Sequence, residues 1–201
     1  RGNKNYHMSA STIHGGIEFI NGEYYIFYHR CTNNTDFSRQ ACAEHINIDE
    51  TGLISQVEVT TQGVEKKALP AKRRWMAAEC CNLYNKKTKK VMGNGHNRDI
   101  PTIVSEQGIS YVAAVDDSTV IGYKYLNFEG ISQLSITYRG SAGEIWVSTD
   151  NPHNVDFKIT LSECSKWTEA KVACNVCGDK LPLFFIYRGS GQIDLYEFEF
   201  K

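Results

Sequence analysis

Hydrophobic and polar residues near the start of the chain follow a pattern that predicts a β-hairpin. Ile17 and Phe19 stand two residues apart, as in a strand with one buried face. Asn21 and Gly22 follow, and this pair favours a tight hairpin turn because both central residues of that turn need a positive φ. Residues 24–29 then form an aromatic and β-branched run that is apolar on both faces. This run predicts a buried strand with its aromatic side chains in a hydrophobic core.

Two further segments after the hairpin also show strand periodicity. Residues 41–48 are a candidate strand in which Cys42, Glu44 and Ile46 share one face. Residues 49–52 have the composition of a turn, and residues 53–60 resume the alternation. We therefore expect two more strands here.

The second half of the chain contains a regular series of short apolar or alternating runs. The predicted strands are residues 111–115, 120–128, 134–138, 145–148, 155–161, 167–173, 183–187 and 193–200. Glycine-rich turns separate them about every 8 to 12 residues, a spacing typical of a β-sandwich. No stretch combines helix caps with the 3.6-residue period of a long helix. The predicted fold class is therefore all-β.

Composition changes after residue 62, which indicates a domain boundary. Residues 66–90 contain nine Lys or Arg residues and one acid, Glu79. The basic residues form two clusters beside the apolar residues 75–83, without the interleaved aromatic residues of a nucleic-acid groove. We interpret these clusters as a solvated linker and turn. The expected domains are residues 1–68 and 69–201.

Charge and composition exclude two classes of partner. The formal net charge of the 201 residues is −1, so no basic field attracts nucleic acid. No apolar run is long enough to predict a membrane span. The chain begins at Arg1 without an initiator methionine, and we expect it to be a piece of a longer protein.

The cysteines point to free thiols rather than to a disulfide framework. There are seven, and an odd number cannot all pair within one chain. Cys174 and Cys177 have the spacing of half a zinc site, but a second such pair is absent. Free thiols favour a reducing compartment such as a bacterial cytoplasm, while secretion stays open.

Four motifs in the first 62 residues stand in an order that resembles a known family. They are His14-Gly15-Gly16, the hairpin with residues 24–29, Ser38-Arg39, and the turn at residues 49–52. Their order and spacing resemble the late blades of the five-bladed β-propeller of glycoside hydrolase family 43. The resemblance implies a partial propeller whose earlier blades lie upstream of Arg1. It also implies that His14 lies near the central cavity, close to a bound ion, and that Arg39 reaches the substrate.

The side chains of His14 and Arg39 suit these roles, and each also has a simpler interpretation. A neutral imidazole such as His14 ligates a metal directly or through water, although a lone histidine is more often a satisfied polar group. The Arg39 guanidinium offers parallel donors for sugar hydroxyls or a carboxylate. The simpler reading of Arg39 is a surface ion pair with Asp36 or Glu44.

The second half resembles a family 6 carbohydrate-binding module, a jelly-roll-like β-sandwich. The matching segments are residues 121–125, 136–148, 167–169, 184–189 and 193–195. The family's stacking Trp and hydrogen-bonding Asn fall at Cys164 and Gln192, so we expect weak glycan binding by this part alone. Tyr123 or Tyr125 is the remaining candidate for an aromatic platform.

The same resemblance implies a structural calcium ion in the second half. Asp194 matches the family's calcium-binding Asp, and Glu79 matches an Ala-Glu pair in its first strand. Calcium prefers several oxygen ligands. The alternative role for Asp194 is to cap a turn.

Glycoside hydrolysis with inversion needs one carboxylic acid and one carboxylate on opposite sides of the bond. The resemblance places these groups in the blades upstream of Arg1, and no acid of the first 62 residues matches them. The acids concerned are Glu18, Glu23, Asp36, Glu44, Asp49, Glu50 and Glu58. The resemblance therefore implies the C-terminal part of a glycosidase acting on arabinofuranose- or xylose-containing plant polysaccharides, inactive by itself. The alternative is a non-catalytic carbohydrate-binding or interaction protein.

Overall fold

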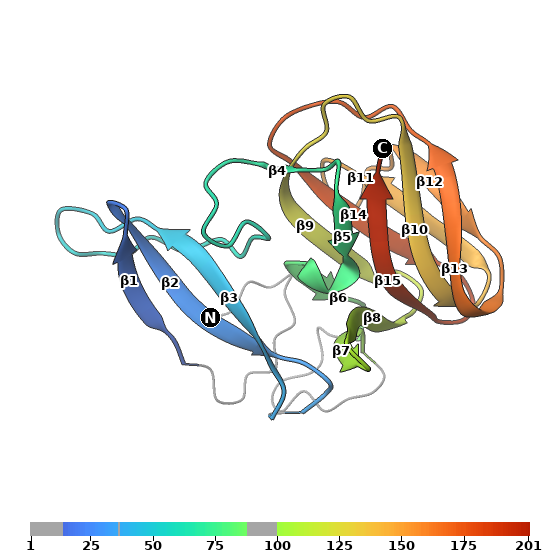
Figure 1. Cartoon of the computed structure of the whole chain (residues 1–201), viewed down its shortest axis with the longest axis horizontal. Coiled ribbons are helices and arrows are strands. Elements are labelled where there is room, and N and C mark those ends of the chain that lie inside the picture. The colour runs from blue at the N-terminus through green and yellow to red at the C-terminus, as the bar shows by residue number, and fades with distance from the viewer. Residues whose placement is uncertain (1–13, 36, 88–99) are drawn as a thin grey trace.

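The computed structural model describes residues 14–35, 37–87 and 100–201, and this part of the chain is all-β. Its one helical element is a single 3₁₀ turn, η1 (Ala77–Glu79). A small sheet of the first three strands lies beside a larger β-sandwich, and an irregular segment connects the two (Figure 1). The predicted fold class is confirmed. The described residues contain no helix that could span a membrane.

The N-terminal sheet consists of β1 (Gly16–Ile20), β2 (Glu23–Cys31) and β3 (Arg39–Ile46) in antiparallel order. Asn21 and Gly22 form the turn between β1 and β2, with φ values of 51° and 85°. These positive angles are the reason why the Asn-Gly pair stands at this position. The predicted hairpin and the first strand after it are therefore confirmed.

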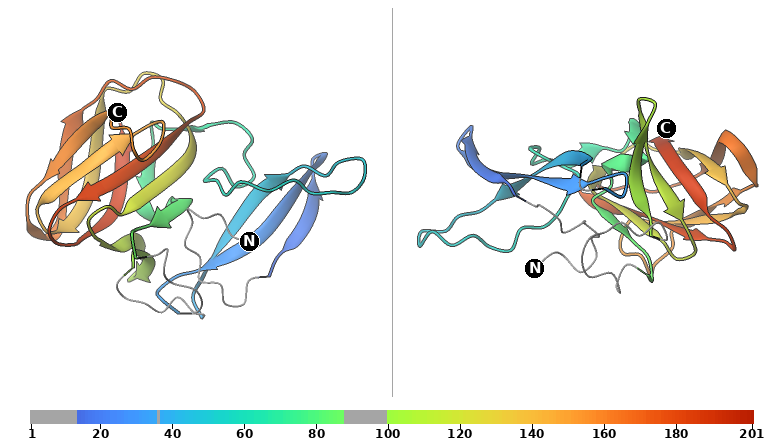
Figure 2. Two further views of the ribbon diagram at one scale, coloured as in Figure 1. Left: turned by 180° about the vertical axis from the view of Figure 1, so that it is seen from behind. Right: turned by 90° about the horizontal axis from the view of Figure 1, so that it is seen from below.

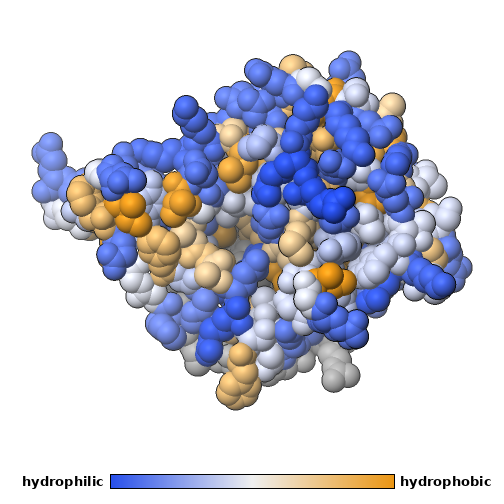
Figure 3. All heavy atoms as spheres, viewed as in Figure 1, coloured by the Kyte–Doolittle hydropathy of each residue, from blue (hydrophilic) through white to orange (hydrophobic). Residues whose placement is uncertain are grey.

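The prediction of a buried β2 is wrong for most of its length. Tyr25 and Arg30 are buried, whereas Tyr24 is 41% exposed and Phe27 and Tyr28 are half-buried. The physical reason is that the N-terminal sheet lies beside the sandwich as a single layer, without a second layer on it in the described residues (Figure 2). Apolar surface consequently gathers over this sheet (Figure 3).

Residues 53–60 do not form the predicted strand. Ile54 makes one isolated bridge to Ile48, and the rest of the segment is irregular. Its backbone bonds to groups other than a neighbouring strand, such as the Glu44 carboxylate, which accepts from Thr60 N at 2.8 Å. The predicted turn before it does form, because Asp49 Oδ1 accepts from the backbone N–H groups of Thr51 and Leu53.

The sandwich has two six-stranded sheets. The first contains β5 (Arg74–Met76), β7 (Thr102–Glu106), β8 (Ile109–Val115), β10 (Gln133–Gly140), β13 (Cys164–Ala173) and β15 (Ile193–Phe200). The second contains β4 (Leu69–Pro70), β6 (Asn82–Tyr84), β9 (Val120–Asn127), β11 (Gly143–Ser148), β12 (Phe157–Leu161) and β14 (Leu181–Arg188). The eight predicted strands are all present. Strands β4, β5 and β6 were not predicted because each has only two or three residues, too few to show a period. Strand β7 was also missed, although it is as long as β1.

Large aromatic side chains fill the space between the two sheets. Trp75 and Tyr123 are both fully buried, and Phe198 packs against both rings, with centroids 6.0 and 4.8 Å away. Tyr123 donates its hydroxyl to Ala77 O at 3.0 Å, so its polar end is satisfied inside the core. Tyr123 is therefore a core residue and not a glycan platform. The residues around Trp75 belong to the sandwich. The predicted solvated linker is therefore restricted to the basic residues beside them.

Side chains of β2 and the loop after it hold the N-terminal sheet to the sandwich. Arg30 is 6% exposed and donates to Cys80 O and Ala78 O, each at 2.5 Å. Asn33 donates its backbone N–H to Ile103 O at 2.8 Å, and its Oδ1 accepts from Ser105 N at 2.7 Å. These bonds fix the relative position of the two parts. The boundary between residues 68 and 69 stays a prediction, although β4 begins at Leu69.

Candidate functional site

The two residues predicted to contact substrate lie at one end of the N-terminal sheet, on either side of His29. The rings of His14 and His29 meet edge to face, with centroids 5.1 Å apart. His29 pairs with Ala41 across β2 and β3, and Arg39 follows two residues away on β3, opposite Cys31. We refer to His14, His29 and Arg39 as the His14 cluster. The fold brings His14 and Arg39 close to His29.

The close approach of the chain at Gly15 positions His14. A Cβ atom on Gly15 would lie 2.1 Å from Phe27 O, so no larger residue fits at this position without movement. Gly16 has open space around its Cβ position, and the requirement applies to Gly15 alone. Gly15 therefore allows the segment before β1 to run close enough to β2 for His14 to reach His29.

The surroundings of His29 disfavour its charged form. Burial lowers the pKa of His29, and the nearby Arg39 guanidinium and His14 ring lower it further. Its Nε2 atom is buried and has no hydrogen-bond partner among the described residues. A neutral ring nitrogen accepts a hydrogen bond or ligates a metal, so the cluster combines an acceptor with the donors of Arg39.

A second group of polar residues joins the N-terminal sheet to the sandwich through Glu44 of β3. Glu44 is 3% exposed. Its Oε1 accepts from Thr60 N at 2.8 Å and from the Tyr28 hydroxyl at 3.1 Å, and its Oε2 accepts from Thr60 Oγ1 at 2.7 Å. Burial raises the pKa of Glu44 to about 7, although these hydrogen bonds oppose the rise.

The segment that Glu44 holds also binds β9 of the sandwich. We call residues 58–61 the junction strap. Glu58 forms an ion pair with Lys124 at 2.7 Å and accepts from the Tyr125 hydroxyl at 2.9 Å. Thr61 donates its backbone N–H to Lys124 O at 2.7 Å. The junction strap thus binds the N-terminal sheet on one side and β9 on the other.

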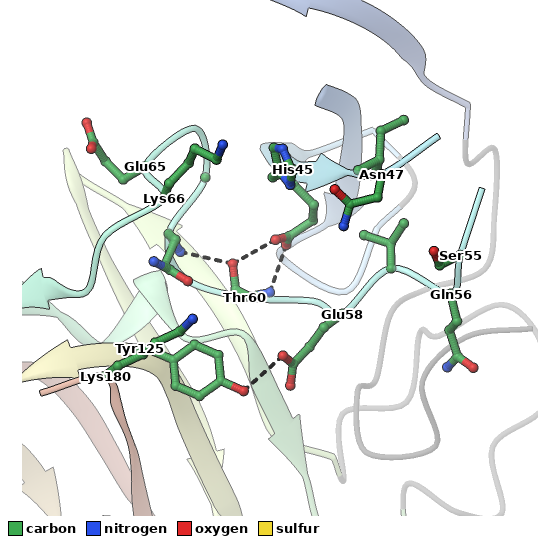
Figure 4. Close-up of a pocket in the computed structure, with 15 residues that line it drawn as sticks. His45, Asn47, Ser55, Gln56, Glu58, Thr60, Glu65, Lys66, Tyr125 and Lys180 are labelled. Carbon is green, nitrogen blue, oxygen red and sulfur yellow. Dashed lines mark hydrogen bonds between the residues drawn. The ribbon is translucent and has the colours of Figure 1, made fainter. Parts of the chain in front are cut away.

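A cavity of about 410 Å³ lies beside the junction strap. We call it the junction pocket. In Figure 4, Asn47, Ser55 and Gln56 lie on one side of it, Tyr125 and Lys180 lie on the other, and the strap runs between them. Both parts of the molecule therefore contribute to its walls.

The two predicted calcium ligands of the second half each bind an arginine. Asp194 accepts from Arg139 at 2.8 Å, and Glu79 accepts from Arg73 at 2.6 Å. Glu79 also accepts from Met76 N at 3.0 Å at the start of η1. Within residues 14–35, 37–87 and 100–201, no three His, Cys, Asp or Glu side chains are arranged to hold a metal ion. The assignment of calcium to these residues stays a prediction.

The expected sugar-stacking position of the sandwich is also visible. Cys164 and Gln192 line one hollow of about 200 Å³ together with Arg139 and Asp194. The sequence therefore located this hollow, and no aromatic side chain lines it. All seven cysteines, including Cys164, are free thiols.

Several residues of these sites were missed from the sequence. Arg30 directly follows His29, and nothing in the sequence separates it from a surface arginine. Glu44 carried a signal, since it stands on the apolar face of its strand between Cys42 and Ile46. An acid in that position predicts a buried carboxylate with dedicated donors. The predicted ion pair of Arg39 with Asp36 lies outside the described residues. The carboxylate of Glu44 accepts hydrogen bonds from Thr60 and Tyr28.

The chain is similar in sequence to a glycosidase. No family model matches it. It is 37% identical over 194 residues to a xylosidase/arabinosidase from Thermoclostridium stercorarium, a match that covers 92% of this chain and 41% of that protein. The chain thus spans about two fifths of the length of this relative.

Solved structures share the fold of both parts. A glycoside hydrolase family 43 arabinoxylan arabinofuranohydrolase from Bacillus subtilis, solved with cellotetraose, has a TM-score of 0.62 at 15% identity and covers 94% of this chain and 40% of its own. The family 6 carbohydrate-binding module CsCBM6-3 from Clostridium stercorarium, solved with cellobiose, has a TM-score of 0.56 at 14% identity and covers 68% of this chain and 98% of its own.

These matches confirm the resemblance found in the sequence. The chain shares its fold with part of a glycoside hydrolase family 43 enzyme, and the sandwich shares its fold with a family 6 carbohydrate-binding module. In sequence, 92% of the chain is similar to a xylosidase/arabinosidase.

Proposed function

We propose that this chain is the C-terminal part of a glycoside hydrolase that acts on arabinofuranose- or xylose-containing plant polysaccharides. The observation that carries the proposal is the 37% identity to a protein named xylosidase/arabinosidase, which extends over 92% of the chain. A match of that extent cannot be confined to a sandwich of a widespread type. It supports a shared arrangement of both parts.

The His14 cluster supplies the residues that we assign to substrate binding. Arg39 presents parallel N–H donors, which suit sugar hydroxyls. His14 contacts His29 of the strand between them and is positioned by the close approach at Gly15. We propose that these two side chains form part of the wall of the substrate site.

The catalytic carboxylates come from propeller blades upstream of Arg1 in this proposal. A general acid needs a raised pKa, and Glu44 has one of about 7. However, Glu44 is 3% exposed and both its oxygens accept hydrogen bonds, so a glycosidic oxygen cannot reach it. Glu58 is bound to Lys124 and Tyr125. These partners support a structural role for both acids.

This proposal keeps two metal sites, an ion near His14, bound directly or through water, and a separate calcium site in the sandwich with Asp194 and Glu79 as its proposed ligands. Calcium takes about six to eight oxygen ligands. At Asp194 and Glu79 an ion would replace Arg139 and Arg73, which now neutralise these carboxylates. We expect the melting temperature to rise with added Ca²⁺ and to fall again with a chelator. An unchanged melting temperature in both conditions would argue against the calcium sites.

The decisive experiment compares the complete protein, with its upstream blades, to residues 1–201. Aryl α-L-arabinofuranosides and aryl β-D-xylosides are the probes. We expect turnover by the complete protein and none by residues 1–201, because the acid and base are absent from the latter. Turnover by purified residues 1–201 would place the active site in this chain. Glycan binding without turnover by the complete protein would favour the alternative of a non-catalytic carbohydrate-binding protein.

A further inference from the structure

The junction pocket has no role in the site around His14, and its walls have the properties of a ligand site. Its volume of about 410 Å³ lies within the range of small-molecule sites. It is lined by the end of β3, by residues 55–66 and by Tyr125 and Lys180 of the sandwich. A ligand in the pocket would therefore touch both parts of the molecule (Figure 4).

Three neutral polar side chains in the wall are available to a ligand. Asn47, Ser55 and Gln56 are exposed, and their side chains form no hydrogen bond with any described residue. Amides and a hydroxyl together offer donors and acceptors. This combination suits hydroxyl groups, which also act as both donor and acceptor.

The charges in the wall are balanced and do not select an ion. Two lining residues, His45 and Lys66, are both bound by Glu23, and the lining residue Glu58 binds Lys124. The wall also contains one further acid, Glu65, and one further base, Lys180. Because no net charge dominates the pocket, we infer that its ligand is neutral.

Tyr125 provides an aromatic wall of fixed orientation. Its ring is half-buried, and its hydroxyl is held by Glu58 at 2.9 Å. Burial and the Glu58 carboxylate raise the pKa of Tyr125 to about 12, so the ring stays neutral. A fixed aromatic ring can pack against the apolar face of a sugar, whose hydroxyls are then available to the polar side chains of the wall.

We propose that the junction pocket binds a sugar unit of a polysaccharide, away from the bond that is cleaved. This inference rests on the proposed function, because it takes the ligand from the same class of polysaccharide. The pocket needs both parts, since Asn47, Ser55 and Gln56 come from the segment before the sandwich and Tyr125 comes from β9. Bound glycan would add to the contacts by which Glu44 and Arg30 hold the parts together.

Isothermal titration of residues 1–201 with xylopentaose and arabinopentaose at neutral pH tests the inference. We expect measurable binding that the double variant Asn47→Ala/Gln56→Ala weakens by about tenfold, as the loss of two hydrogen bonds implies. Tyr125→Ala should weaken it similarly, whereas Tyr125→Phe should retain most of it because the ring remains. Because Asn47 and Gln56 are exposed, the double variant should fold like the unmodified chain. A thermal melt checks this.

Gln192→Ala is the matched control, because Gln192 lines the other hollow of the sandwich. Binding that is lost in Gln192→Ala and kept in Asn47→Ala/Gln56→Ala would overturn the proposal and place the glycan in that hollow. Absence of binding by residues 1–201 would also overturn it.

The complete protein separates this inference from the proposed function. Turnover of aryl glycosides together with unaltered oligosaccharide affinity in Asn47→Ala/Gln56→Ala would overturn the pocket and leave the hydrolase intact. Oligosaccharide binding that depends on the pocket, without any turnover, would support the pocket and contradict the proposed hydrolase. If both hold, the double variant should keep its rate on aryl glycosides and lose efficiency on the polysaccharide.

Discussion

The N-terminal sheet and the sandwich are built from the same kind of alternating sequence, yet they bury their side chains to very different degrees. In the sandwich, Trp75, Tyr123 and Phe198 are at most 1% exposed between two sheets. In the N-terminal sheet, Phe19 is 61% and Tyr24 is 41% exposed. The difference shows that alternation specifies which face of a strand is apolar, while a second layer is needed to cover that face.

The comparison also separates the region that stabilises the fold from the region that carries the proposed substrate-binding residues. The sandwich has a closed core and carries the stability, whereas the His14 cluster lies on the single-layered sheet. The hydrogen bonds of Arg30 and of the junction strap hold the N-terminal sheet, with its His14 cluster, against the sandwich. Four predictions test this division, from the largest expected effect to the smallest.

Separation of the two regions should have the largest effect. Residues 69–201 should unfold cooperatively when expressed alone, because both layers of the core lie within them. Residues 1–68 should associate, because a single layer exposes its edges and apolar faces. Thermal melting and size-exclusion chromatography measure both outcomes. A monomeric fragment 1–68 with a cooperative melt would remove the distinction between the regions.

Truncation of aromatic side chains should affect the regions unequally. Trp75→Ala should lower the free energy of unfolding by about 3 to 5 kcal/mol, as expected for a fully buried aromatic residue. Phe19→Ala should change it by less than about 1 kcal/mol because the side chain is already exposed to solvent. Urea denaturation of residues 1–201 compares the two variants. Equal losses would mean that Phe19 is covered in solution.

Truncation of Arg39 in the N-terminal sheet should affect activity much more than stability. Arg39→Ala is therefore measured in the complete protein. If Arg39 binds the sugar in the transition state, kcat/KM should fall by roughly 10²-fold while the melting temperature stays within a few degrees. Arg39→Lys should restore little, since an ammonium group cannot reproduce the two parallel donors. Kinetics near those of the unmodified protein in either variant would assign Arg39 to a surface ion pair.

The junction should respond to pH through Glu44. Its pKa of about 7 in the folded state is above the ordinary value of 4.5, so the folded state favours the protonated form. The stability from this shift is fully present below pH 4.5 and is lost as the pH rises through about 7. We expect a loss on the order of 2 kcal/mol between pH 5 and pH 8 in residues 1–201.

Glu44→Gln serves as the control for this pH dependence, because it keeps an acceptor for Thr60 and cannot ionise. The melting temperature of this variant should vary less between pH 5 and pH 8 than that of the unmodified chain. The same variation in both proteins would show that groups other than Glu44 cause it.

The local features of this protein are determined by its sequence. The Asn21-Gly22 turn and the eight longer strands of the sandwich follow from backbone freedom and side-chain alternation over a few residues. These features depend on neighbours in the chain, and a sequence displays them directly.

Only the tertiary structure decided which partners those elements find. Residues 53–60 alternate like a strand, but Glu44 and Lys124 bind part of this segment as a strap instead. Strands β4 to β7 form because longer strands offer them hydrogen-bonding edges. His29 and the junction pocket arise from residues far apart in sequence. Their burial and pairing depend on contacts over long sequence separations, which no local pattern encodes.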